Sequence, residues 1–92
     1  MDDTRIPIEE LVKFPTKYTF KAIGHHKLTF TGRVLEAVRK VLGEDRKIEL
    51  RTRLSSKGAY VSVTLVARVE NADELRGVYA ALRTVSEVIT VL

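Results

Sequence analysis

Two short segments of this 92-residue chain hold the residues whose types and spacing could do chemistry. In the first, His25 and His26 are adjacent and follow Gly24. A zinc site needs three or four converging ligands, whereas adjacent histidines in an extended loop point in different directions and no Asp or Glu lies in the same loop. We therefore expect both histidines to be solvated and to bind no metal. The alternative is a protonation-sensitive contact with a partner, because imidazole titrates near neutral pH.

The second segment is Ser55-Ser56-Lys57-Gly58. Its hydroxyls, its ammonium group and the N–H groups of a turn could together bind a small anion. It is not a Walker loop, because the spaced glycines and the following helix are missing. The simpler interpretation is a hairpin turn in which Gly58 supplies a positive φ.

Composition limits the classes of partner and of site. The chain has 16 Lys and Arg against 12 Asp and Glu, a net charge of +4, which favours weak contacts with polyanions but identifies none. The absence of cysteine excludes disulfides, thiolate zinc sites and cysteine nucleophiles, and is typical of a reducing compartment. No apolar run reaches the ~7 to 15 residues of a secretory signal or the ~18 to 20 residues of a membrane span. We expect a cytoplasmic protein with no membrane contact.

Hydrophobic periodicity predicts the elements that must position these segments. Alternating apolar residues indicate strands at 16–23, 47–54, 58–69 and 85–92, and Gly24 is expected to end the first. Helical spacing of apolar residues predicts one helix between Thr29 and Leu42 and another that begins at Asn71. The element order is therefore β-α-β-β-α-β.

Helix ends carry their own signals. Thr29 or Thr31 can cap the first helix, and Gly43 fits a left-handed C-cap. Asn71 is expected to cap the second helix, with the Glu74 side chain reaching back to the N–H of the cap residue.

A chain of this size folds as one domain, and a sheet covered by helices on one side is the economical arrangement. We predict an α+β, ferredoxin-like domain at residues 15–92 whose four-stranded antiparallel sheet has the order 4-1-3-2, because two interleaved right-handed crossovers give that order. Strands two and four are then the edges. Residues 1–14 form an N-terminal segment with a helical turn at Ile8–Lys13, which packs on the domain or docks on another protein.

The alternation divides the strand residues between two faces. The face expected to carry both helices holds Tyr18, Phe20, Ala22, Ile48, Leu50, Leu54, Val61, Val63, Leu65, Ala67, Ile89 and Val91. The opposite, open face is polar and mildly basic, with one aromatic residue, and holds Thr19, Lys21, Ile23, Glu49, Arg51, Arg53, Tyr60, Ser62, Thr64, Arg68, Ser86, Val88 and Thr90.

Several local strings give the chain a family resemblance. Phe14-Pro15 leading into Tyr18-Thr19-Phe20-Lys21, then the segment 55–58 followed by Tyr60, and a last strand that closes on Val91-Leu92 resemble the YbeD family of small bacterial proteins. The resemblance spans residues 8–92. It implies a ferredoxin-like fold similar to ACT regulatory domains, in a family whose biochemical activity is not established.

ACT domains sense amino acids or other small molecules near the loop between the first strand and the first helix. Gly24 matches the glycine that such a loop needs, but the residues that follow it, 25–29, lack the acidic residue and the second glycine typical of amino-acid-binding ACT loops. The resemblance therefore implies a regulatory module without implying amino-acid sensing.

The residues fit two other functions of this fold less well than a binding module. Acylphosphatases need an asparagine on the third strand, and the only asparagine here is Asn71, which we expect to cap a helix. RNA-binding domains with the same element order need aromatic residues where this chain has Ala59 and Val61, so base stacking would rest on Tyr60 alone. Weak RNA binding by the open face remains the alternative hypothesis.

We therefore predict a non-catalytic, ACT-like regulatory or interaction module without cofactors, which binds a partner protein or a small ligand. Strand 86–92 carries Glu87 as its only charge and is rich in β-branched residues, which favours a homodimer through this edge. The candidate binding residues are Lys21, Gly24, His25, His26, Arg51, Arg53, Ser55, Ser56, Lys57, Gly58 and Tyr60.

Overall fold

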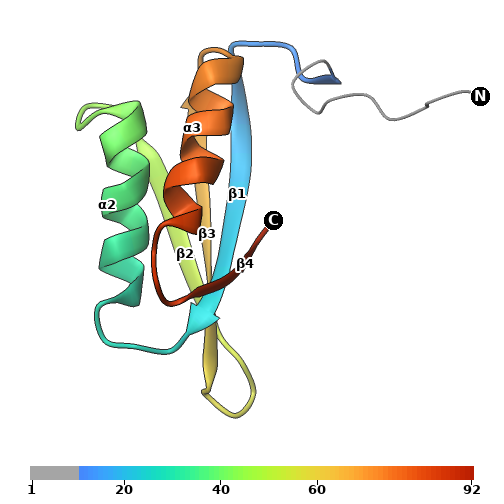
Figure 1. Ribbon diagram of the computed structural model, residues 1–92. Coiled ribbons are helices and arrows are strands. Elements are labelled where there is room, and N and C mark those ends of the chain that lie inside the picture. Colours follow the sequence, from blue (N-terminus) through green and yellow to red (C-terminus); the bar gives the residue numbers. More distant parts are fainter. Residues whose placement is uncertain (1–10) are drawn as a thin grey trace, which may run out of the picture.

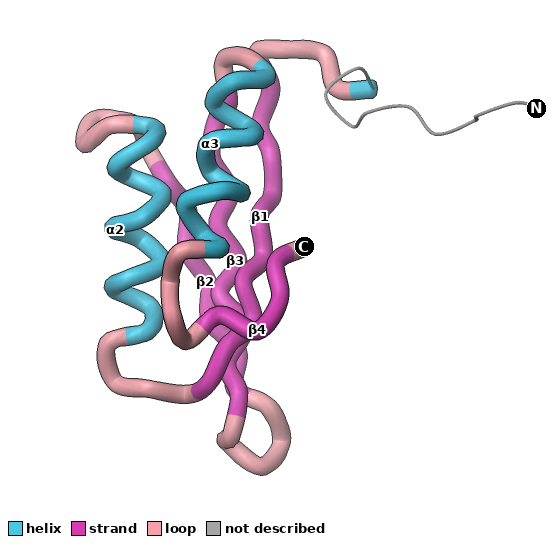
Figure 2. Tube along the Cα trace, viewed as in Figure 1, coloured by secondary structure: helices cyan, strands magenta, loops and turns pink. Residues whose placement is uncertain are grey.

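The computed structural model describes residues 11–92. Its elements are β1 (Thr16–His25), α2 (Phe30–Leu42), β2 (Ile48–Leu54), β3 (Tyr60–Val69), α3 (Ala72–Arg83) and β4 (Val88–Val91), as Figures 1 and 2 show. The sheet order is β2-β3-β1-β4 and all neighbours are antiparallel, which confirms the predicted order 4-1-3-2 and the ferredoxin-like fold. The helical turn predicted from Ile8 begins outside the described residues.

Both helices cover the same face of the sheet (Figure 1), and the hydrophobic core lies between them. The core follows from periodicity, because residues two apart on a strand and three or four apart on a helix share a face. Its largest fully buried side chains are Phe20, Phe30, Leu65, Leu75, Leu82, Val34, Val38, Val63, Val69 and Val78. No helix within residues 11–92 is long and apolar enough to cross a membrane.

The start of α3 confirms the predicted cap and corrects its partner. The Asn71 side chain accepts a hydrogen bond from the backbone N–H of Glu74 at 2.9 Å. The Glu74 carboxylate, however, accepts from the N–H of Glu70 at 2.9 Å and not from that of Asn71. Arg46 explains this position, because its guanidinium donates two hydrogen bonds of 3.0 Å to the same carboxylate.

The ends of α2 differ from the prediction in their details. Thr29 occupies the N-cap position but its side chain makes no capping hydrogen bond, and Thr31 lies inside the helix. Gly43 has a positive φ of 92°, yet its ψ of 162° lies outside the left-handed helical region. The N–H of Gly43 still closes the helix by donating to the carbonyl of Arg39 at 2.8 Å.

β1 is longer than predicted. It continues through Gly24 to His25, which pairs with Tyr60 at the start of β3. The expectation that Gly24 ends the strand is therefore wrong, because the ladder with β3 holds the backbone extended beyond the glycine.

β4 is shorter than the predicted strand 85–92, and its face assignment is corrected. The register shifts between Ile23 and Gly24, so that Val88 and Val91 both lie on the helix side while Ile89 is 52% exposed. A bulge inserts one extra residue and breaks the strict alternation on which the prediction for Ile89 and Val88 depended.

Leu54 is the other residue whose burial was predicted wrongly. It is 51% exposed, although its β3 partner Val61 is buried. Leu54 lies at the end of an edge strand, which has a neighbour on one side only, so the layer that covers β3 does not extend over it.

Candidate functional site

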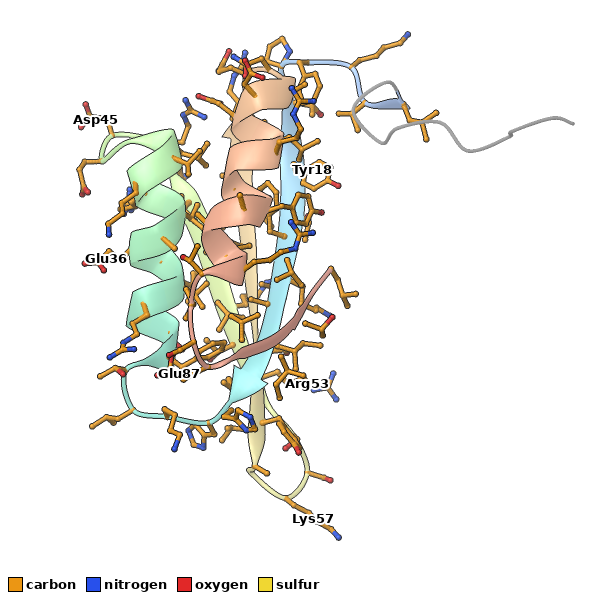
Figure 3. All side chains as sticks on the ribbon, viewed as in Figure 1. Tyr18, Glu36, Asp45, Arg53, Lys57 and Glu87 are labelled. Carbon is orange, nitrogen blue, oxygen red and sulfur yellow. The ribbon has the colours of Figure 1, made fainter. Side chains whose placement is uncertain are left out.

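The predicted hairpin turn is present between β2 and β3, and its polar groups largely satisfy one another. Ser55 donates its N–H to the carbonyl of Tyr60 at 2.9 Å, and its hydroxyl accepts from the N–H of Tyr60 at 3.1 Å. Gly58, with φ 75°, donates to the carbonyl of Ser55 at 2.9 Å. Three N–H groups are thus used inside the turn. Ser56 and Lys57 remain exposed, with Lys57 at the tip (Figure 3).

The two segments with candidate chemistry lie against each other, which the sequence alone did not reveal. His26 donates its backbone N–H to the carbonyl of Ala59 at 3.0 Å, and its Nδ1 lies 3.1 Å from the carbonyl oxygen of Gly58. His25 turns instead toward Tyr60, with the ring centroids 5.7 Å apart. The adjacent histidines therefore diverge, and each contacts the hairpin.

Gly24 serves internal packing. It is buried, and a Cβ atom at this position would lie 2.5 Å from the Glu87 carbonyl oxygen and 2.6 Å from Cζ of Phe30. The close approach that requires a glycine is thus one between β1, the start of α2 and the turn before β4. Among residues 11–92, no three His, Asp or Glu side chains are grouped so that they could hold a metal ion.

Three cations on the open face of the sheet have no acidic partner in the described part of the chain: Lys21, Arg51 and Arg53. Lys21 and Arg51 lie in one row across the sheet, because each pairs with Thr64 of β3. Strands are ~4.8 Å apart and residues of one face are ~7 Å apart along a strand, so the three side chains start within ~12 Å of one another. We call this group the open-face site.

The neighbouring cations of the same face are paired. Lys17 lies 3.6 Å from Glu49, and Arg68 donates to Glu70 at 2.8 Å. Among the cations within the strands of this face, those left without an acidic partner therefore lie nearer the end that carries the hairpin.

A shallow hollow adjoins the open-face site. It is lined by Ile23, Arg53, Leu54, Ser55, Tyr60, Val61 and Ser62. Tyr60 is 45% exposed, so the hollow offers one aromatic contact next to a guanidinium group.

A second hollow, for which the sequence gave no signal, lies between α2 and the turn that follows α3. Its lining includes Arg33, Glu36, Lys40, Thr84 and Ser86. Arg33 also donates to Glu87 at 3.2 Å and so ties α2 to the turn before β4. Residues this far apart in sequence are brought together only by the packing of the two helices.

The ionisable groups with displaced pKa values lie outside the open-face site. Hydrogen bonds from Arg46 lower the pKa of Glu74, and the same bonds raise the pKa of Arg46. Burial, followed by the hydrogen bond with Tyr18, raises the pKa of Tyr79. Glu74 and Arg46 meet at the start of α3, and Tyr79 meets Tyr18 of β1.

Comparison with known sequences assigns the chain to a described group. Residues 9–92 match the family model for proteins of unknown function called DUF493. A UPF0250 protein of Shewanella oneidensis is 34% identical over 84 residues, which cover 91% of this chain and 93% of the relative. A UPF0250 protein of Shewanella sediminis is 32% identical over the full length of both chains.

Comparison with solved structures shows the fold. Protein HP0495 from H. pylori has a TM-score of 0.73 at 17% identity, covering 98% of each chain. The ACT domain from the GTP pyrophosphokinase of Chlorobium tepidum has a TM-score of 0.64 at 23% identity, covering 85% of this chain and 96% of that domain. The predicted likeness to ACT domains is therefore confirmed at the level of the fold.

Proposed function

The chain belongs to the DUF493 (UPF0250) family of proteins of unknown function, as the YbeD resemblance predicted, and from this premise we propose that it is a non-catalytic regulatory or interaction module. Its ACT-like fold supports this proposal, because the ACT neighbour is a domain of a larger enzyme. The module binds its partner protein or small ligand at the open-face site.

One observation carries the proposal: Lys21, Arg51 and Arg53 have no acidic partner among the described residues and lie beside an exposed apolar hollow. Cations that neighbours leave uncompensated are available to carboxylate or phosphate groups, and guanidinium groups bind both in a bidentate manner. A ligand that carries an anionic group beside an apolar group fits this surface. Tyr60 would contact its apolar part.

Weak RNA binding is the second candidate, and the same three cations favour it. The face offers a single aromatic side chain, Tyr60, which already contacts the ring of His25. Stacking of about 1 to 3 kcal/mol on one aromatic residue gives a weak binder, so we place this candidate second.

The test is affinity capture from the native host with the full chain, followed by mass spectrometry and rebinding of the purified partner. Arg51→Glu with Arg53→Glu should abolish capture, whereas Lys27→Glu with Lys40→Glu removes the same charge elsewhere and should leave it intact. Material that disappears after nuclease treatment would support RNA. A partner that both double variants retain equally would remove the open-face site from the proposal.

We also propose the homodimer through β4. Ile89 and Leu92 expose 52% and 62% of their surface at this sheet edge, and β-branched residues without charge favour strand pairing. Ile89→Lys introduces a charge at an exposed edge position and should leave the protein monomeric in sedimentation at high micromolar concentration. A wild-type chain that is itself monomeric there would remove the homodimer.

A further inference from the structure

On the side of β1 where β4 lies, only the C-terminal half of β1 has a neighbouring strand. β4 pairs only with Ala22, Ile23 and Gly24. Lys21 then exchanges both backbone hydrogen bonds with Leu92, at 3.0 and 2.7 Å. Figure 1 shows Leu92 beside the middle of β1, and no strand among residues 11–92 accompanies β1 from 16 to 20 on this side.

Backbone groups of β1 point into this open position. Successive residues of a strand direct their N–H and C=O groups to opposite neighbours, so Lys17 and Thr19 share the orientation of Lys21. The N–H of Lys17 and both groups of Thr19 find no partner in the described chain, while the Lys17 carbonyl accepts only from the Thr16 hydroxyl at 3.2 Å. Such a row is a template for an added strand.

On the helix side, an aromatic wall flanks the open position. The Tyr18 and Tyr79 hydroxyls are 3.1 Å apart, and the rings of Tyr18 and Phe20 have centroids 4.8 Å apart. The Arg83 guanidinium lies 5.7 Å from the centroid of Tyr79. Figure 3 shows Tyr18 beside β1 at the margin of the sheet. Side chains of an added strand that point toward the helices would contact the partly exposed Tyr18 and Tyr79, whereas Phe20 is fully buried behind them.

The charges around the open position determine which kind of added strand can bind there. Lys17 and Lys21 extend from β1 on the open face, and Arg83 lies on the helix side. The acidic side chain paired with Lys17 is Glu49 of β2, which lies on the far side of β3. Two copies of this edge placed together would bring their cations together, so the charges favour an acidic occupant over a second copy.

We propose that β1 between Thr16 and Phe20 binds an extended acidic segment of a partner protein as an additional antiparallel strand. Alternation fixes its pattern. Residues opposite Tyr18 and Phe20 are apolar and face the helix side, whereas those opposite Lys17 and Thr19 are acidic, the first beside Lys17 and the second between Lys17 and Lys21. The inference shares Lys21 with the open-face site but does not require that site to bind its own ligand.

The probe is a blocked peptide of about seven residues with alternating glutamate and valine, titrated into the nitrogen-labelled full chain and followed by the amide signals of Lys17 and Thr19. Both signals should shift and become protected from hydrogen exchange. Because the glutamate N–H groups face β1 in this register, methylating them should weaken binding about tenfold or more. Methylating the valine N–H groups, which face outward, should change affinity less than about twofold.

Controls separate this edge from general charge attraction. Lys21→Glu should weaken binding of the glutamate–valine peptide about fivefold, because it places a like charge beside the peptide glutamates, whereas Lys40→Glu on α2 should leave the affinity unchanged. A lysine–valine peptide should not bind. The proposal is overturned if no shift appears at Lys17 or Thr19 at about 1 mM peptide, or if methylation at either set of N–H groups has the same effect. Protection of these amides that rises with protein concentration alone would assign the edge to a second copy instead.

Discussion

The two faces of the sheet differ in how completely their polar and charged side chains find hydrogen-bond or ion-pair partners within the chain. On the helix-covered face, the buried residues are apolar and no buried side-chain N or O atom within residues 11–92 lacks a hydrogen-bond partner. On the open face, Lys21, Arg51 and Arg53 have no acidic partner in the same part of the chain.

This difference separates stability from binding. A side chain that is fully satisfied within the fold contributes to the free energy of unfolding, and its loss is felt there. A solvated cation without a partner contributes little to stability, so its substitution should alter binding affinity and not the free energy of unfolding. Substitutions at single positions, each with a control at a similar residue, test that separation.

Gly24→Ala should give the largest loss of stability. The added methyl group would lie within 2.7 Å of the Glu87 carbonyl and of two Phe30 ring atoms, and overpacking of this kind costs about 2 to 3 kcal/mol. The control is Gly32→Ala in α2, where nothing lies within 4 Å and the helix should gain about 0.5 to 1 kcal/mol. Urea unfolding measures both. Equal midpoints for the two variants would show that Gly24 is not packed as described.

Glu74→Gln should cause the next largest loss of stability, about 1 to 2 kcal/mol at neutral pH, because it weakens the hydrogen bonds with Arg46. The folded-state pKa of Glu74 lies below its usual value of 4.5, so the pair stabilises the protein fully above that pH. This contribution is lost as the pH falls through the lowered pKa. Unfolding curves of wild type and variant should therefore converge in acid.

The control for this pair is Glu49→Gln, which removes an exposed ion pair with Lys17 at 3.6 Å. Exposed pairs contribute at most about 1 kcal/mol and often nothing measurable, so its unfolding midpoint should barely change. A larger loss for Glu49→Gln than for Glu74→Gln would contradict the contrast between the two faces.

Asn71→Ala should lower stability by about 1 kcal/mol through loss of the α3 cap, without altering binding at the open face. Asn71→Asp keeps a side-chain oxygen that can accept from the N–H of Glu74 and should restore most of the difference. A urea midpoint that does not move in Asn71→Ala would remove this cap as a source of stability.

The fold was predictable because its signals are local and repeat along the chain. The period-two pattern of β3 and the Asn71 cap each determine structure within a few residues, and both were confirmed. The errors lie where a tertiary contact decides: the bulge that turns Ile89 outward, the extension of β1 through Gly24, and the exposed end of β2 at Leu54.

The sites were less predictable, for a related reason. Composition and alternation predicted that Lys21, Arg51 and Arg53 lie on one face. They did not predict that these cations lack acidic partners, because that depends on the register of three strands. The contact of His26 with the hairpin joins residues 32 positions apart. The open position beside β1 exists because β4 pairs with only part of a longer strand, and strand ends are poorly determined by local sequence.

Arg51→Ala with Arg53→Ala should have the smallest effect on stability, within about 0.5 kcal/mol, because neither guanidinium has a partner in the described chain. If the open face binds RNA, the same variant should weaken binding equally for all sequences and reduce the slope of log affinity against log salt by about 1 to 2, since each phosphate contact contributes ~0.7 to 0.9. Lys27→Ala with Lys40→Ala removes two cations elsewhere and should leave that slope unchanged. If both double variants lower the slope equally, RNA is attracted only by net charge. If the Arg51 and Arg53 variant lowers the unfolding midpoint substantially, these arginines contribute to stability. That result would contradict the separation of stability from binding between the two faces.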